Sequence, residues 1–289
     1  MKLDIPAGLD WLRVSEKGRA WLDALPGNVD HCVVRWDLNV GEPFPRAYTS
    51  LVLPARRRDG SECILKLAYP DRESEHEALA LERWNGEGAV RLLERDEAVG
   101  ATLIERCLPG QPLAERGQSH ALEIFCGLVP RLWKPATSPP FRSLAEEAGW
   151  WASHLRENWE SAGRPFEASL IDTALDALHT LPATQGGQVL LHQDLHAGNV
   201  LSAQREPWLV IDPKPLVGER EFALAPIIRS AELGHGRRAV VERLDVLTAR
   251  LALDRDRARL WCIAQTVAWS FGSELLPRHV ETATWLMSA

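Results

Sequence analysis

Apolar and polar residues alternate in short stretches through the first hundred positions, and each stretch is bounded by turn-forming residues. That pattern is typical of β-strands. Strands are predicted at 31–40, 48–55, 62–67, 89–94 and 101–106. The segment 71–84 instead spaces its apolar residues as a helix does, and a shorter helical pattern at 14–25 ends at Pro26-Gly27. The N-terminal part is therefore expected to be a five-stranded antiparallel sheet with one main helix.

The pattern changes after Leu108–Pro112, whose prolines and glycine indicate a linker. Beyond it, apolar residues recur at helical spacing. Helices are predicted at 119–133, 143–159, 169–181, 237–253 and 257–271. Ser143 to Glu146 has the sequence of a capping box, and Asp254 is the predicted cap of the last helix. The chain is thus expected to be an α+β protein with an N-terminal lobe at 1–107 and a mostly helical C-terminal lobe at 108–289.

One stretch, 189–219, interrupts the helical pattern of the second lobe. It holds two short strand-like pieces, VLL and WLVI, and each is followed by acidic or amide side chains. Catalytic groups are often held in loops that a rigid scaffold positions. We therefore expect Asp194, Asn199 and Asp212 to meet at one point.

The residue types in this stretch suit phosphoryl transfer. An H-x-D-x-x-x-x-N pattern is followed, after an apolar strand, by a second aspartate. Asp194 would accept the proton of an attacking hydroxyl, while Asn199 and Asp212 would hold Mg²⁺ through oxygen atoms against the nucleotide phosphates. A polar turn between two strands of an unrelated α/β protein is the alternative, and His192 and the Asp-Pro sequel argue against it.

Lys66 interrupts an apolar strand-like run. A buried ammonium without an anionic partner is costly, so this residue needs a carboxylate or phosphate nearby. Glu77, on the helix that follows, is the preferred partner, and Glu73 on the same helical face is the second choice. The alternative is that Lys66 is an ordinary lysine on an edge strand.

Composition narrows the class of protein further. A net charge of −7 argues against non-specific binding of nucleic acid and mildly favours cationic small molecules, although such a charge commonly serves solubility alone. No apolar run approaches the roughly 20 residues that span a bilayer, and the N-terminus has no apolar signal core. The five cysteines are scattered without a C-x-x-C pair, which favours neither zinc nor a disulfide framework and fits a reducing cytoplasm.

The run HQDLHAGNVL, followed by WLVIDPKPLVGE, resembles the aminoglycoside/hydroxyurea antibiotic phosphotransferase family, which includes streptomycin 6-phosphotransferases. That family carries H-G-D-L-H-x-x-N and then I-D-P-x-x-L-x-G-E. This chain departs at Gln193, where glycine is usual. The resemblance covers about 36–272 and is strongest over 189–219.

The resemblance implies a two-lobed protein-kinase-like fold that binds ATP and Mg²⁺ in a cleft. Lys66, held by Glu77, would neutralise the α- and β-phosphates, and His196 would lie near the γ-phosphate. Three further cofactor contacts follow by analogy: hydroxyl or backbone donors of Ser50 to phosphate, and backbone groups of Glu105 and Cys107 to the adenine edge. His192 is expected to brace the loop through a backbone carbonyl.

Four residues are candidates for contacts with the acceptor molecule. Glu219 would either meet a cationic substrate or pair with a local arginine. The late helix of the resembled family borders the acceptor pocket, which nominates Gln265, Trp269 and Glu274, with core packing as the alternative for the tryptophan.

The motifs predict a monomeric kinase that phosphorylates a hydroxyl of a small molecule, and the resemblance implies that this molecule is an aminoglycoside such as streptomycin and that the reaction confers resistance. A kinase for hydroxyurea or another metabolite is the first alternative. A catalytically silent nucleotide-binding module is the second, and the joint presence of Lys66, Asp194, Asn199 and Asp212 argues against it. A protein kinase is the third, and the absence of D-F-G and A-P-E signatures argues against that.

Overall fold

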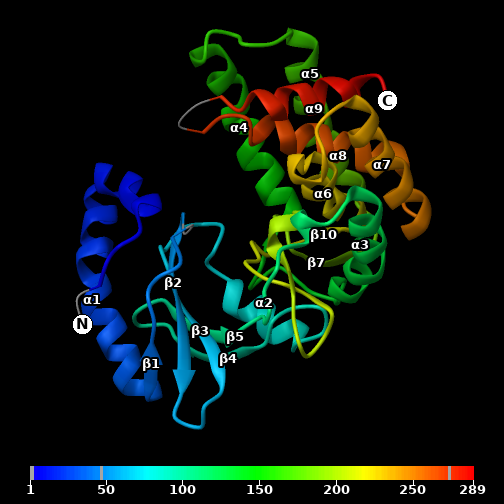
Figure 1. Cartoon of the computed structure of the whole chain (residues 1–289). Coiled ribbons are helices and arrows are strands. Elements are labelled where there is room, and N and C mark those ends of the chain that lie inside the picture. Colours follow the sequence, from blue (N-terminus) through cyan, green and yellow to red (C-terminus); the bar gives the residue numbers. More distant parts are fainter. Residues whose placement is uncertain (1–2, 46–47, 273–274) are drawn as a thin grey trace. The chain divides into compact units, whose positions relative to one another are not determined.

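The computed structural model of the chain describes residues 3–45, 48–272 and 275–289. Its contacts divide the chain into two compact units, Met1–Gly110 and Gln111–Ala289, whereas the sequence placed the boundary after residue 107. Figure 1 shows the sheet of the first unit and the helices of the second.

The first unit is built on a five-stranded sheet in the order β1-β2-β3-β5-β4, in which all neighbours are antiparallel. The strands are β1 (Leu38–Val40), β2 (Ser50–Arg57), β3 (Glu62–Ala68), β4 (Leu92–Asp96) and β5 (Ala101–Glu105). The predicted five-stranded antiparallel sheet is therefore confirmed. The strand at its centre is β3, which carries Lys66.

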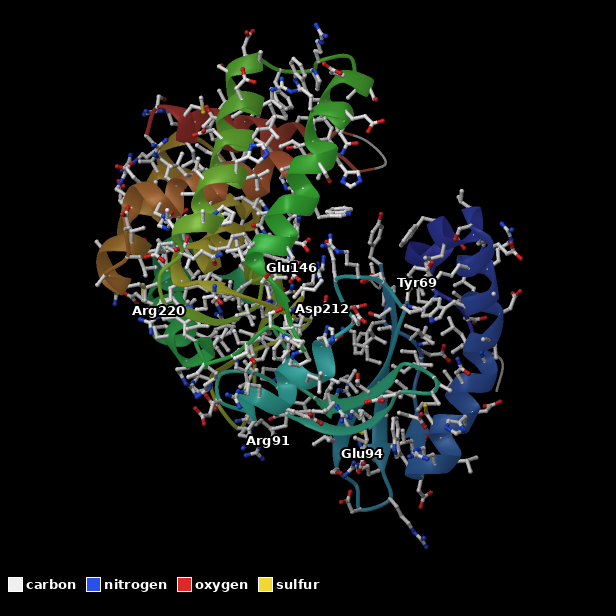
Figure 2. All side chains as sticks on the ribbon, turned by 180° about the vertical axis from the view of Figure 1, so that it is seen from behind. Tyr69, Arg91, Glu94, Glu146, Asp212 and Arg220 are labelled. Atoms are coloured by element: carbon white, nitrogen blue, oxygen red, sulfur yellow. The ribbon has the colours of Figure 1, made fainter. Side chains whose placement is uncertain are left out.

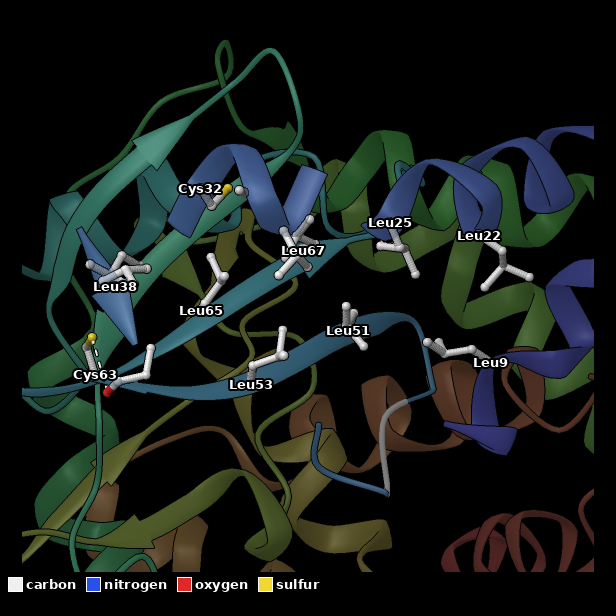
Figure 3. Packing of buried hydrophobic residues seen from close by; sticks show 14 of the residues in the cluster. Leu9, Leu22, Leu25, Cys32, Leu38, Leu51, Leu53, Cys63, Leu65 and Leu67 are labelled. Carbon is white, nitrogen blue, oxygen red and sulfur yellow. Dashed lines mark hydrogen bonds between the residues drawn. The ribbon is translucent and has the colours of Figure 1, made fainter. Parts of the chain in front are cut away.

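The prediction of a strand over 31–40 was wrong for most of its length. Helix α1 (Glu16–Trp36) runs through Pro26 instead of ending there, and it follows the 3₁₀ segment η1 (Ala7–Val14). Buried residues continue along one face of this helix on both sides of the proline: Leu22, Leu25, Val29 and Cys32. Figure 3 shows this face packed on the leucines of β2 and β3. Burial of the apolar stripe outweighs the lost backbone hydrogen bond.

The helix predicted over 71–84 is α2 (Glu77–Trp84), which begins six residues later than predicted and is shorter than α1. The carboxylate of Asp71 accepts hydrogen bonds from the backbone nitrogens of Glu73 and Ser74 and from the Ser74 hydroxyl. A side chain that caps its own backbone in this way competes with helix formation. The helix therefore starts at Glu77.

The second unit is mostly helical, as predicted. Its α-helices are α3 (Gln118–Leu132), α4 (Leu144–Ser161), α5 (Ala168–Thr180), α6 (Ala225–Arg229), α7 (Arg237–Leu251), α8 (Arg255–Ala268) and α9 (Pro277–Met287). Short 3₁₀ segments occur at η2 (Leu113–Glu115), η3 (Leu181–Thr184), η4 (Ala197–Asn199), η5 (Arg220–Leu224) and η6 (Ala231–Leu233). The capping box at Ser143 and the cap at Asp254 are confirmed. Within the described ranges, no helix is both long and apolar enough to cross a bilayer.

Small sheets interrupt the helices of the second unit. The strands β7 (Gln188–Leu191) and β10 (Leu216–Glu219) pair antiparallel, and β6 (Arg142–Ser143) joins β10 in parallel. A hairpin of β8 (Val200–Ser202) and β9 (Trp208–Val210) forms another sheet. The loops that leave β7 and β9 carry the residues predicted to meet.

Close packing explains why the LVGE run has a glycine. A Cβ atom at Gly218 in β10 would lie 2.6 Å from the Cβ of Leu144 and 3.1 Å from a methyl carbon of Leu191. Helix α4 therefore approaches this strand too closely for any side chain at that position. The close contact fixes β10, and with it the segment between β9 and β10.

We predict that Gly218→Ala lowers the free energy of unfolding by about 1–3 kcal/mol, because the added methyl overpacks the contact with Leu144. Gly187→Ala is the matched control, since a Cβ there meets no atom within 4 Å. Chemical denaturation of both variants measures the difference. Equal stabilities for Gly218→Ala and the control would contradict the packing argument.

Candidate active site

Backbone-directed hydrogen bonds tie the loop after β7 to the segment after β9. The Nε2 of His192 donates to the carbonyl of Ile211 at 2.9 Å, and the backbone nitrogen of Lys214 donates to the carbonyl of His192 at 3.0 Å. The backbone nitrogen of Ile211 in turn donates to the carbonyl of Asn199 at 3.0 Å. These bonds bring Asn199 beside Asp212, which Figure 2 labels.

His192 is a structural brace, as the sequence predicted. Its ring is buried, and burial lowers the pKa of His192 to about 4, although the nearby Asp194 and Asp212 carboxylates oppose that shift. The imidazole is therefore neutral near pH 7. Its Nε2–H is engaged by the Ile211 carbonyl, so the ring locks two loops together.

Asp194 lies between two cations. The Nζ of Lys214 is 3.4 Å from Oδ2, and an Nη2 of Arg229 is 3.7 Å from Oδ1. Burial alone would raise the pKa of Asp194, but Lys214 and Arg229 outweigh it and hold that pKa below its ordinary value. The carboxylate is thus ionised and suited to accept a hydrogen bond from a hydroxyl.

Asn199 and Asp212 offer oxygen atoms of the kind that Mg²⁺ prefers. The Nδ2 of Asn199 donates to the carbonyl of Asp194 at 2.9 Å, which leaves the amide oxygen as the atom that a cation would contact. Asp212 adopts a left-handed backbone, with φ of 58°, and its side chain is partly exposed. One carboxylate and one amide oxygen fit an ion that takes few ligands from protein.

His196 is oriented by a residue that the sequence analysis missed. Its Nδ1 lies 3.1 Å from the Glu232 carboxylate, and the backbone nitrogen of Gly198 donates to the same carboxylate at 2.9 Å. Burial would lower the pKa of His196, but Glu232 and Asp194 outweigh burial and raise it. The Nε2 edge of the ring is then left to donate to another group.

In the first unit, the predicted pairing of Lys66 with Glu77 is confirmed. The Nζ of Lys66 is 2.7 Å from both carboxylate oxygens of Glu77, and the two side chains are only 7% and 5% exposed. The edge-strand alternative fails, because β3 lies at the centre of its sheet. A central strand thus presents a fixed ammonium group.

The remaining cofactor candidates also lie in the first unit. Ser50 is buried at the start of β2. The backbone nitrogen of Glu105 donates to the carbonyl of Arg91 at 2.9 Å, so this donor is already used within the unit. Cys107 is buried two residues after β5.

The four acceptor candidates have different surroundings. Glu219 is 2% exposed, its oxygens accept from the Nε of Arg257 at 2.7 Å, and Trp261 also donates to it. The alternative of an arginine partner for Glu219 is thus confirmed. Gln265 is fully buried on α8, whereas Trp269 is only partly buried. Glu274 lies outside the described residues.

The backbone conformation at Gln193 explains why glycine is usual at this position in the resembled family. Its backbone is left-handed, with φ of 61°, a region that side chains rarely adopt and that costs about 1 kcal/mol or more. Its side chain is buried, and its carbonyl accepts from the Nε2 of Gln265 at 3.2 Å. The loop therefore keeps the conformation that glycine would give, supported from α8.

The fold agrees with that of known small-molecule kinases. A choline kinase from Streptococcus pneumoniae superimposes with a TM-score of 0.62 at 15% identity, over 90% of this chain and 97% of that one. At this identity the likeness concerns the fold. The likeness places the chain in the fold class of kinase-like proteins.

Sequence comparison gives the family. The profile described as aminoglycoside/hydroxyurea antibiotic resistance kinase matches residues 35–271. A hydroxyurea phosphotransferase of Kitasatospora aureofaciens is 40% identical over 277 residues, covering 92% of this chain and 78% of that protein. A streptomycin 6-kinase of Streptomyces griseus is 39% identical over 256 residues, covering 86% and 83%. The chain belongs to this family of antibiotic resistance kinases and is a nucleotide-using phosphotransferase.

We predict that Glu232→Gln lowers the pKa of His196. The raised pKa depends on Glu232, so without its charge the effect of burial dominates and the imidazolium is lost at a lower pH. An NMR titration of the ring protons measures the shift directly. Glu123→Gln, beside the exposed His120, is the matched control and should leave the pKa of His196 unchanged; an equal pKa in both variants would contradict the assignment.

Proposed function

We propose that the protein transfers the γ-phosphoryl group of ATP to a hydroxyl of an aminoglycoside, with streptomycin as the first candidate, and so confers resistance. The observation that carries the proposal is the ionised Asp194 in a loop that hydrogen bonds tie to Asn199 and, through Asn199, to Ile211, the residue before Asp212. The 39% identity to a streptomycin 6-kinase supports the choice of acceptor.

The proposed reaction uses Asp194 as the group that orients the acceptor. Its carboxylate accepts a hydrogen bond from the hydroxyl, whose oxygen forms a bond to the γ-phosphorus as the bond to the β,γ-bridging oxygen breaks. The hydroxyl proton passes to Asp194, and ADP leaves. Because the transition state is loose, positioning and electrostatics supply most of the rate.

Each unit carries groups that suit the nucleotide phosphates. Asn199 and Asp212 would hold Mg²⁺, which neutralises phosphate charge when bound. The ammonium of Lys66, fixed by Glu77 at 2.7 Å, would neutralise the α- and β-phosphates. The Nε2–H of His196 would donate to the γ-phosphate, since Glu232 occupies its other ring nitrogen.

A neutral acceptor such as hydroxyurea is the second candidate, and two observations favour it. Lys214 and Arg229 place positive charge within 4 Å of the Asp194 carboxylate, which disfavours a cationic group next to the reacting hydroxyl. Glu219, a candidate contact for a cation, is instead buried against Arg257. The 40% identity to a hydroxyurea phosphotransferase is in keeping with this.

We predict that Asp194→Ala slows ADP release about 10²–10⁴-fold, the usual contribution of a positioned base, with ATP binding nearly intact. A coupled assay of ADP release and calorimetric titration of ATP measure the two quantities. Asp172→Ala removes an exposed carboxylate that pairs with Arg156 and is the matched control. Turnover of Asp194→Ala equal to that of the control would remove the proposed mechanism.

The acceptor is identified by measuring ADP release with streptomycin, with other aminoglycosides and with hydroxyurea in parallel. We expect turnover with streptomycin and a product whose mass has gained one HPO₃ group. Turnover with hydroxyurea alone would transfer the assignment to the neutral acceptor. Failure of ATP to bind at all would contradict the kinase proposal itself.

A further inference from the structure

We propose that Arg229 is a further catalytic residue, which together with Lys214 binds the phosphoryl group during transfer, and that Gln265 and Trp269 position it. The proposal rests on the proposed function and assigns the charge that stabilises its transition state. The Nη2 of Arg229 and the Nζ of Lys214 lie 3.7 Å and 3.4 Å from the carboxylate oxygens of Asp194.

The position of Asp194 sets where the phosphoryl group must pass. A hydroxyl hydrogen-bonded to that carboxylate lies about 2.6–3.2 Å from it, and the phosphorus approaches the same hydroxyl oxygen. Donors that stand 3–4 Å from the carboxylate are therefore within reach of the phosphoryl oxygens. The structure places Lys214 and Arg229 at that distance.

Charge balance supports the same interpretation. Asp194 and Asp212 contribute two negative charges beside the position proposed for the γ-phosphate, which itself carries negative charge. Transfer through a loose transition state spreads charge over three equatorial oxygens. Mg²⁺, when bound, would offset Asp212, while Lys214 and Arg229 offset Asp194 and leave the transferred group in a favourable field.

Arg229 is held in place by its own helix and by two side chains. It ends helix α6, and its side chain is 7% exposed. Its Nη1 donates to Oε1 of Gln265 at 2.8 Å, and its guanidinium carbon lies 4.4 Å from the centre of the Trp269 ring. The Nζ of Lys214 lies 4.9 Å from the same ring centre. The ring thus supports both cations.

Gln265 connects this cation to the loop that carries the base. Its Nε2 donates to the carbonyl of Gln193, the residue directly before Asp194. Gln265 is fully buried, so it acts on Arg229 and on the loop rather than on the acceptor. One amide therefore fixes the guanidinium relative to the carboxylate, which makes Gln265 a positioning residue.

The test uses the full chain, ATP and the acceptor found in the screen. We expect Arg229→Ala to lower kcat about 10³-fold or more, the scale known for arginines that stabilise phosphoryl transfer. The KM for ATP should change little, because the ground-state contacts of Lys66 and of the metal ligands remain. Added guanidinium chloride at millimolar concentration should restore part of the turnover.

A transition-state analogue separates this role from mere support of Asp194. ADP with aluminium fluoride mimics the transferred group, so Arg229→Ala should lose its tight binding while the affinity for ADP alone stays. If Arg229 only holds the base, ADP with aluminium fluoride binds the variant as well as it binds the wild type. That result would overturn the proposal.

Gln265→Leu provides a second variant that keeps the guanidinium and removes its partner. We expect kcat to fall about 10–100-fold with KM for ATP unchanged, since a small misplacement of a catalytic group costs on that order. Thr266→Val is the matched control, because Thr266 is equally buried on the same helix and lies outside the site. Equal kcat for the two variants would overturn the positioning role.

The outcomes separate this inference from the proposed function. A wild-type protein that neither binds ATP nor phosphorylates any acceptor refutes both. A wild-type protein that turns over, with Arg229→Ala folded by its thermal transition and close to wild type in kcat, refutes only the role of Arg229.

Discussion

The largely buried carboxylate of Asp194 must stay ionised to accept a hydroxyl proton. Two cations of the second unit keep it ionised. Without its cations, burial would raise the pKa of Asp194. Lys214 comes from the segment after β9, and Arg229 comes from the end of α6. Their convergence requires that both segments be fixed relative to the loop after β7.

Backbone-directed hydrogen bonds supply that rigidity. The neutral ring of His192 holds the Ile211 carbonyl, and the backbone nitrogen of Lys214 holds the carbonyl of His192. Gln265 supports the loop from α8 through the carbonyl of Gln193. The side chains of His192 and Gln265 thus fix the main chain of the segments that carry the reacting groups.

The sequence predicted an element or a contact correctly wherever a local rule determines it. The central strands, the capping box at Ser143, the brace of His192 and the pair of Lys66 with Glu77 followed from spacing, from cap chemistry or from the cost of a buried charge. The apolar periodicity likewise gave the long helices of the second unit. The resemblance supplied the roles of these residues but not their contacts.

Tertiary packing decided the rest. The stripe of α1 continues through Pro26, so a local helix-breaking signal gave the wrong element at 31–36. Arg229 and Glu232 lie in short elements without an apolar period of their own. Their importance comes from partners 35 and 36 positions away, Asp194 and His196. A single sequence carries no signal for such pairs.

The most direct test of the account is a crystal structure of the full chain with Mn²⁺ and a non-hydrolysable ATP analogue. Anomalous scattering from Mn²⁺ locates the metal. The account predicts that this ion binds the Asn199 amide oxygen and the Asp212 carboxylate, with the γ-phosphate facing Asp194. A metal ion held by other residues, or a γ-phosphate directed away from Asp194, would contradict it.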